Sequence, residues 1–232
     1  VIFPKLSRLT AGGREGEFQD TIRQTVHTSL FFVLPMSAGL MVVSRPLVSL
    51  IYGGGIFDRF AVEITSSALA WMSLGMAGYG VQNILSRACF ARQDGRGPLA
   101  DGAASIGVNI ALCQVLAEPF GVAGLAISST VSSTVYALLL LLPMERRGQG
   151  VLDRGMLLEL AKMTLSASAM GVCGWAEQSG LSGWLLPGKA GELLSLALCA
   201  GLGAAVYFLL TFFLGLGEAK LALSLVKKQK RG

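Results

Sequence analysis

Long apolar segments separated by short charged ones dominate the chain. Uncharged intervals lie between Arg23 and Arg45, Glu63 and Arg87, Asp101 and Glu118, Glu118 and Glu145, and Glu192 and Glu218. Each interval approaches the roughly 20 residues with which a helix crosses about 30 Å of hydrocarbon. A sixth apolar segment carries Glu159 and Lys162 in its first turns, at a spacing that allows them to pair on one helix face. The pattern predicts six membrane-spanning helices.

We expect these helices at about residues 26–51, 64–90, 99–117, 121–144, 156–175 and 193–216. The apolar runs are continuous, whereas strands of a membrane β-barrel alternate over roughly 10 residues. Inside a bilayer a helix satisfies its own backbone hydrogen bonds. The expected fold is therefore an all-α, polytopic transmembrane helical bundle.

Composition and charge agree with this fold class. Hydrophobic residues make up 53% of the 232 and charged residues 14%, with a mean hydropathy of +0.62. Lys and Arg concentrate in residues 5–23, 87–96, 146–154 and 220–231, and the opposite side of the predicted bundle carries only Arg45, Arg59 and Lys189. Because Lys and Arg favour cytoplasmic loops, both termini are predicted to be cytoplasmic. The net charge of +5 then reflects membrane topology, and nucleic acid is not an expected partner.

Four segments follow from this pattern. Residues 1–24 are expected to hold the end of a preceding helix, stopping near Pro4, and a cytoplasmic interfacial connector. Residues 25–144 hold four predicted spans, residues 145–217 two more, and residues 218–232 a basic cytoplasmic tail. Because the chain starts at Val1 in mid-pattern, we expect it to be part of a longer protein.

Sequence signatures of catalysis are scarce. The four cysteines fall in or beside apolar spans without C-x-x-C spacing, and the chain has one histidine. It contains no H-E-x-x-H, G-x-S-x-G or G-x-G-x-x-G pattern. We therefore expect no enzyme activity, no metal and no cofactor.

Polar side chains at membrane depth are the candidate binding residues, because such groups usually face a bundle interior or a watery cavity. They are Gln82, Asn83, Arg87, Asn109 and Gln114. Asn83 and Arg87 are one helical turn apart and can share a cavity wall, where an amide and a guanidinium suit a phosphate. Two alternatives for Arg87 are snorkelling toward cytoplasmic headgroups and an ion pair with Asp94.

Pro35 lies inside the first predicted span. A proline in a membrane helix frees a backbone carbonyl and usually kinks the helix. We expect Pro35 to be a hinge.

Four ordered motifs carry a family resemblance: FPKLSRL, RPLVSLIYGGGIF, ILSRACFARQDGRGPL and GVAGLAIS. Together they resemble the C-terminal half of the MurJ/MviN lipid II flippases, which belong to the multidrug, oligosaccharidyl-lipid and polysaccharide exporter superfamily. The resemblance implies the last six helices of a fourteen-helix, two-lobe fold. It places residues 25–144 in the second lobe and makes residues 145–217 the two additional helices that form a lipid-tail groove.

The same resemblance implies a function. Such a protein lies in the bacterial inner membrane and moves lipid II, an undecaprenyl pyrophosphate-linked muropeptide, to the outer leaflet by alternating access. Its implied partners are membrane lipids and the N-terminal lobe, and the family's best-supported cavity arginines lie outside this chain. Within this chain, the resemblance implies cavity-lining candidates only in the neighbourhood of Asn83 and Arg87. Three alternatives are a drug or polysaccharide exporter, a non-transporting membrane scaffold and an intramembrane transferase.

Overall fold

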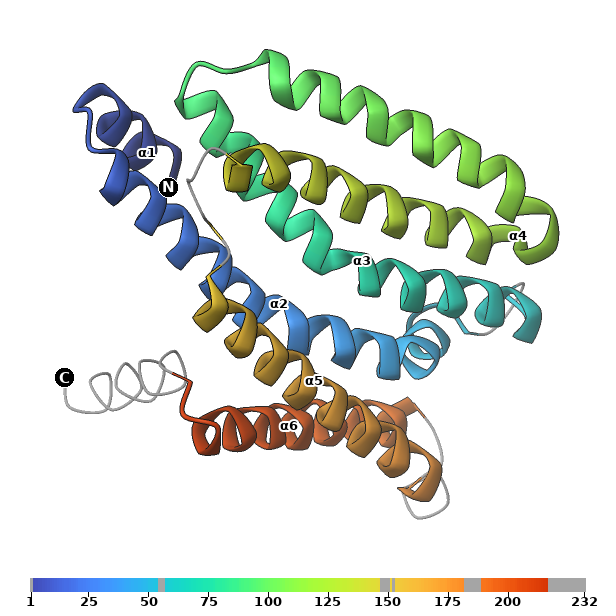
Figure 1. Cartoon of the computed structure of the whole chain (residues 1–232). Coiled ribbons are helices and arrows are strands. Elements are labelled where there is room, and N and C mark those ends of the chain that lie inside the picture. The colour runs from blue at the N-terminus through green and yellow to red at the C-terminus, as the bar shows by residue number, and fades with distance from the viewer. Residues whose placement is uncertain (1, 54–56, 147–150, 152, 182–188, 217–232) are drawn as a thin grey trace.

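The computed structural model describes residues 2–53, 57–146, 151, 153–181 and 189–216, and its elements are helices (Figure 1). In chain order they are α1 (Ile2–Ala11), α2 (Glu15–Tyr52), α3 (Arg59–Ala91), α4 (Arg96–Arg146), α5 (Arg154–Leu181) and α6 (Lys189–Phe213). This arrangement confirms the all-α fold. The predicted basic tail, residues 218–232, lies outside the described residues.

Helix α4 is a helical hairpin. Its 51 residues would extend over about 75 Å as one straight helix, far more than the hydrocarbon thickness. Gly121 interrupts it with φ 55° and ψ −131°, a conformation open mainly to glycine, and the two arms lie side by side in Figure 1. Asn109 Nδ2 donates to Ser132 Oγ across the arms at 3.2 Å. Among the described residues, the five helices that could span a membrane therefore contain all six predicted spans.

The N-terminal connector is more helical than predicted. We expected a helix end near Pro4, but α1 continues through Pro4 to Ala11. No described helical carbonyl lies four residues before Pro4, so its missing N–H leaves no described acceptor of α1 without a donor. Helix α2 likewise begins at Glu15, well before the predicted span at residue 26.

Two hydrophobic clusters join the helices. The larger joins α1, α2, α3, the second arm of α4 and the start of α5, and includes Leu6, Phe18, Leu85 and Met144. The smaller joins α2 to α5 and α6 and consists of Phe31, Met163, Ala167, Met170, Tyr207 and Leu216. Helix α2 thus contributes to both clusters and holds the α5–α6 pair against the rest of the bundle (Figure 1).

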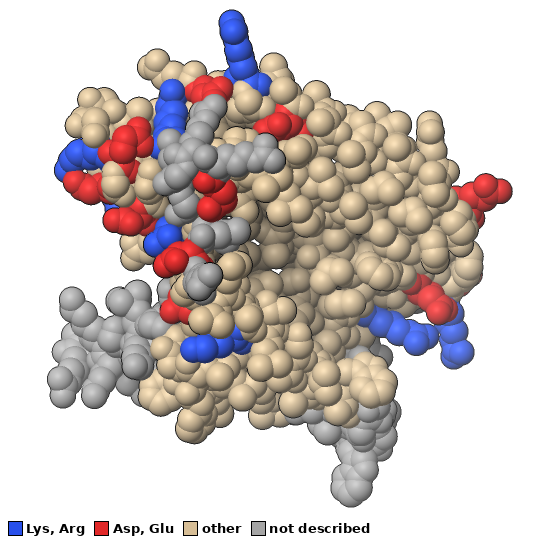
Figure 2. All heavy atoms as spheres, viewed as in Figure 1, with Lys and Arg blue, Asp and Glu red and all other residues tan. Residues whose placement is uncertain are grey.

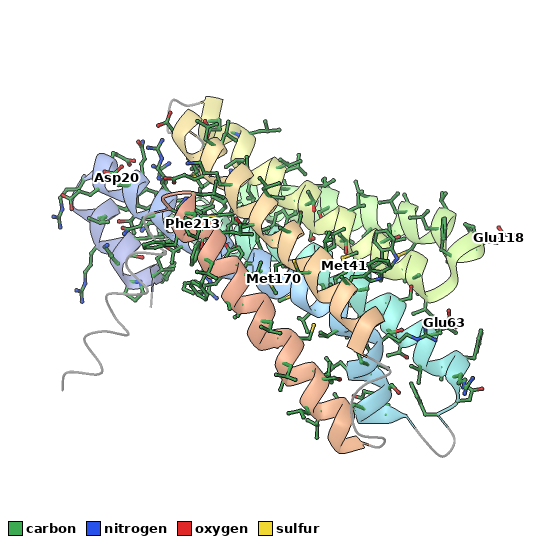
Figure 3. The ribbon with its side chains drawn as sticks, turned by 90° about the horizontal axis from the view of Figure 1, so that it is seen from below. Asp20, Met41, Glu63, Glu118, Met170 and Phe213 are labelled. Carbon is green, nitrogen blue, oxygen red and sulfur yellow. The ribbon has the colours of Figure 1, made fainter. Side chains whose placement is uncertain are left out.

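Charged side chains gather at one end of the molecule, around α1 and the start of α2, with a smaller group at the far end (Figure 2). In Figure 3, Asp20 and Phe213 lie at the first end, Glu63 and Glu118 at the other, and Met41 and Met170 between them. The uncharged zone between the ends carries exposed large apolar side chains, including Ile106 at 62% and Leu209 at 57% exposure. Such a surface suits contact with lipid.

Candidate functional site

An apolar groove opens between α2, α5 and α6. Its cavity volume is about 420 Å³. The lining comes mainly from the second half of α2 and the facing sides of α5 and α6, with one residue of α3. The residues that define it are Phe32, Pro35, Met36, Gly39, Met76, Met170, Gly174, Cys199, Gly203, Tyr207 and Phe208. This size and lining suit an aliphatic chain.

Glycines shape the groove where the helices come close. A Cβ atom at Gly203 of α6 would lie 3.1 Å from Met170 Cε, and one at Gly39 of α2 would lie 3.2 Å from the same atom. A Cβ at Gly174 would meet Val42 at 3.2 Å. The absence of side chains at these positions lets α5 approach both α2 and α6.

Pro35 forms part of the groove wall. Helix α2 remains helical through Pro35 and changes direction along its length in Figure 1. The side chain of Tyr207 on α6 reaches this part of α2, and its hydroxyl donates to the Phe31 carbonyl at 2.8 Å. The predicted hinge therefore lies within the groove; its movement stays a prediction.

The two strongest candidate residues lie on one exposed face of α3. Both Asn83 and Arg87 are exposed, and one turn of helix separates them. Met76, which lines the groove, is two turns before Asn83 on the same face, about 10 Å along the helix axis. Along this face, from the groove toward the end of α3, the side chains form a row that changes from the apolar Met76 to the amide of Asn83 to the cationic Arg87. Among the described residues Arg87 has no ion-pair partner, and Asp94 instead accepts from Gly97 N at 3.2 Å.

The other candidate residues are not brought to this row. Gln82 is partly buried beside it, and its Oε1 has no hydrogen-bond partner among the described residues. Asn109 is engaged between the two arms of α4, where it donates to Ser132 and its Oδ1 accepts from Cys113 Sγ at 3.7 Å. Gln114 is exposed on the first arm. These contacts indicate that Asn109 packs the two arms of α4 together.

Arg92 has a role that its charge pattern did not indicate. As part of the basic cluster at residues 87–96 it is predicted to mark the cytoplasmic side, but its guanidinium also lies 4.4 Å from the centroid of the Phe18 ring and pairs with Glu15. It therefore ties the end of α3 to the start of α2. The spacing of Arg92 from these two partners in sequence gave no signal for this contact.

The predicted pair of Glu159 and Lys162 is also replaced by contacts between helices. Glu159 Oε2 lies 2.7 Å from Nε2 of the buried His27 on α2. Lys162 Nζ donates to the Leu214 carbonyl at 3.1 Å, just beyond the end of α6. These two contacts tie α5 to α2 and to the end of α6.

Proteins of known family resemble the chain along its length. It is 29% identical over 235 residues to the probable lipid II flippase MurJ of Rhizobium meliloti, with 100% of this chain and 43% of the relative covered. It is 27% identical over 216 residues to the protein of the same name from Vibrio cholerae, covering 93% of this chain and 41% of the relative. The chain thus spans less than half the length of these relatives.

A solved structure has the same fold. It is titled lipid II flippase MurJ, inward closed conformation, and matches with a TM-score of 0.70 at 21% identity, covering 90% of this chain and 41% of that one. A model of the family lipid II flippase MurJ matches residues 1–188. With five described helices able to cross a membrane, this chain is a multi-pass membrane protein of the lipid II flippase MurJ family.

Proposed function

We propose that the chain is the C-terminal part of a flippase that moves lipid II from the cytoplasmic to the outer leaflet of the bacterial inner membrane. The observation that carries the proposal is the continuity between the apolar groove and the polar row on α3. The groove takes the polyprenyl tail, and Asn83 and Arg87 contact the pyrophosphate end of the headgroup. One helix face, through Met76, connects the two regions.

The physical task supports this division of roles. A pyrophosphate-linked headgroup crosses hydrocarbon only at a cost of several kcal/mol for each desolvated charge. A wet path with a guanidinium and an amide lowers that cost, while the tail stays in an apolar environment. The chain acts as a transporter rather than as an enzyme in this proposal.

The remaining assignments belong to the same proposal. Residues 25–144 form most of the second lobe, residues 145–217 add two helices, and α2 joins these two in lining the groove. Both ends of the chain face the cytoplasm, and an N-terminal lobe supplies the other side of the cavity. Alternating access uses Pro35 as a hinge.

A complementation experiment tests the function. The complete protein and the 232-residue chain alone are expressed in a bacterial strain whose own lipid II flippase is depleted, and lipid II exposed on the outer leaflet is labelled. We expect the complete protein to restore labelling and the chain alone to fail. Normal growth with no restored labelling would contradict the proposal, and efflux of a cationic drug instead would favour a drug exporter.

A further inference from the structure

Pro35 leaves a backbone acceptor without its helical donor. In an α-helix the N–H of each residue donates to the carbonyl four residues earlier, and proline has no N–H. Pro35 lies within the continuous helix α2, so the carbonyl of Phe31 loses its helical hydrogen bond. Phe31 is 0% exposed, which excludes water as a simple replacement.

Tyr207 replaces the missing donor from another helix. Its hydroxyl donates to the Phe31 carbonyl at 2.8 Å, and Tyr207 itself is only 1% exposed. The two rings also pack together, with centroids 5.5 Å apart. Pro46 frees the carbonyl of Val42 in the same way, yet no described side chain donates to that carbonyl. Of the two prolines inside α2, only Pro35 has its freed carbonyl paired with a described side chain.

The predicted hinge and the hydrogen-bond donor that pairs with it border the same cavity. Pro35 of α2 and Tyr207 of α6 both line the groove. A chain that fills the groove touches both side chains, and any displacement of α6 relative to α2 either breaks the Tyr207 hydrogen bond or bends α2 with it.

We propose that Tyr207 is a positioning residue that couples occupancy of the groove to the bend of α2 at Pro35. The hydroxyl holds the bent form of α2 by satisfying the Phe31 carbonyl. A polyprenyl chain in the groove moves α6, and Tyr207 transmits this movement to the hinge. The coupling to a lipid chain rests on the proposed function, whereas the pairing of Tyr207 with the proline does not.

Four variants of the complete protein in lipid nanodiscs test the pairing: wild type, Y207F, P35A and P35A/Y207F. Spin labels at Gln24 and Arg45, both exposed on α2, flank Pro35. Along a straight helix they are about 32 Å apart, within the range of pulsed electron resonance. The labels are introduced after the native cysteines of the complete protein have been replaced by alanine.

We expect Y207F to broaden and shift the distance distribution, and we expect P35A/Y207F to match P35A. In the P35A background a backbone N–H again reaches the Phe31 carbonyl, so the hydroxyl is no longer needed. If Y207F alone fails to fold, P35A should restore folding. No change in Y207F, an equal change in both backgrounds, or a double variant that stays unfolded would each overturn the pairing.

Tyr136→Phe is the matched control. The Tyr136 hydroxyl also donates to a backbone carbonyl, that of Pro98 at 3.1 Å, but Pro98 lies in α4 with no proline four residues later. Its carbonyl keeps the N–H of residue 102 as a helical donor. The Gln24–Arg45 distribution should be unchanged by this substitution, and a change as large as that of Y207F would overturn the pairing.

Undecaprenyl phosphate is the probe for the coupling, with bound lipid counted by native mass spectrometry. The wild-type distance should shift when the probe binds, and Y207F should bind the probe without that shift. A full shift in Y207F would overturn the coupling. If no variant binds the probe, the groove assignment under the proposed function fails and the coupling fails with it, while the four-variant comparison still decides the pairing.

Discussion

Met170 packs against the backbone of Gly203, so closely that a Cβ atom there would lie 3.1 Å from Met170 Cε and 3.3 Å from Met170 Cγ. Met170 belongs to α5 and Gly203 to α6, and both residues line the apolar groove. The contact sets the width of the groove. A larger side chain at Gly203 must displace Met170 or fill the cavity.

Gly203→Leu should therefore weaken binding of a polyprenyl chain. Overpacking costs about 1–3 kcal/mol, which corresponds to a loss of affinity of about 5- to 150-fold. Native mass spectrometry with undecaprenyl phosphate measures this loss. Gly201→Leu is the control, because a Cβ at Gly201 meets nothing within 4 Å and the residue is exposed. Equal binding by the two variants would contradict a role for the groove.

Arg87→Ala should reduce lipid II transport by the complete protein. A hydrogen bond to a charged group contributes about 1.5–3 kcal/mol, so the reduction should be about tenfold or more. Arg87→Lys should retain part of the activity, since an ammonium keeps the charge but loses the planar fork of donors.

Arg96→Ala is the matched control for Arg87. Both arginines are exposed, but Arg96 is at the start of α4, beyond the turn that follows α3. Transport should be close to that of the wild type. If both Arg87 variants transport lipid II as well as the wild type does, Arg87 does not contact the substrate and instead snorkels to the headgroups.

Arg92→Ala should destabilise the junction of α2 and α3. The cation–π contact with the buried Phe18 ring and the pair with Glu15 are lost together, and a partly desolvated cation–π contact contributes about 1–2 kcal/mol. Chemical unfolding of the purified chain measures the change in the free energy of unfolding. Arg14→Ala removes an ion pair with Glu17 whose side chains are 58% and 60% exposed, so its effect should be near zero. Equal effects would show that Arg92 contributes only surface charge.

Gly121→Ala should destabilise the α4 hairpin. Gly121 has φ 55° and ψ −131°, a strained backbone conformation that costs about 1–3 kcal/mol for a residue with a Cβ atom. Gly107→Ala changes a glycine inside the first arm, where a Cβ meets nothing within 4 Å, and should be neutral or stabilising. The same unfolding measurement compares the two. A neutral Gly121→Ala variant would mean that the turn does not require a positive φ.

The spans were predictable because membrane-spanning helices are encoded locally, by uninterrupted apolar length. The row of Asn83 and Arg87 was predictable for a similar reason, since the helical period alone puts residues four apart on one face. Even the folding back of α4 was implied, because the charged Glu118 and the Pro119–Gly121 segment separate its two apolar arms.

Contacts between helices were not predictable in this way. Asn109 was a cavity candidate, but the packing of the α4 arms places it against Ser132. The spacing of Glu159 and Lys162 allows them to pair on one helix, yet Glu159 contacts His27 across the α2–α5 interface. The groove likewise depends on α2, which the sequence assigns to a different segment from α5 and α6. Each outcome depends on which helix faces meet.

Photo-crosslinking of lipid II shows whether the lipid tail binds in the groove. A photoreactive amino acid replaces either Phe208, which lines the groove at 40% exposure, or its neighbour Leu209, which is 57% exposed outside the groove. Both positions of the complete protein lie at the same membrane depth, so only the groove distinguishes them. Binding of the tail in the groove predicts a lipid II adduct at Phe208 and little at Leu209. Equal adducts at the two positions, or an adduct at Leu209 alone, would contradict it.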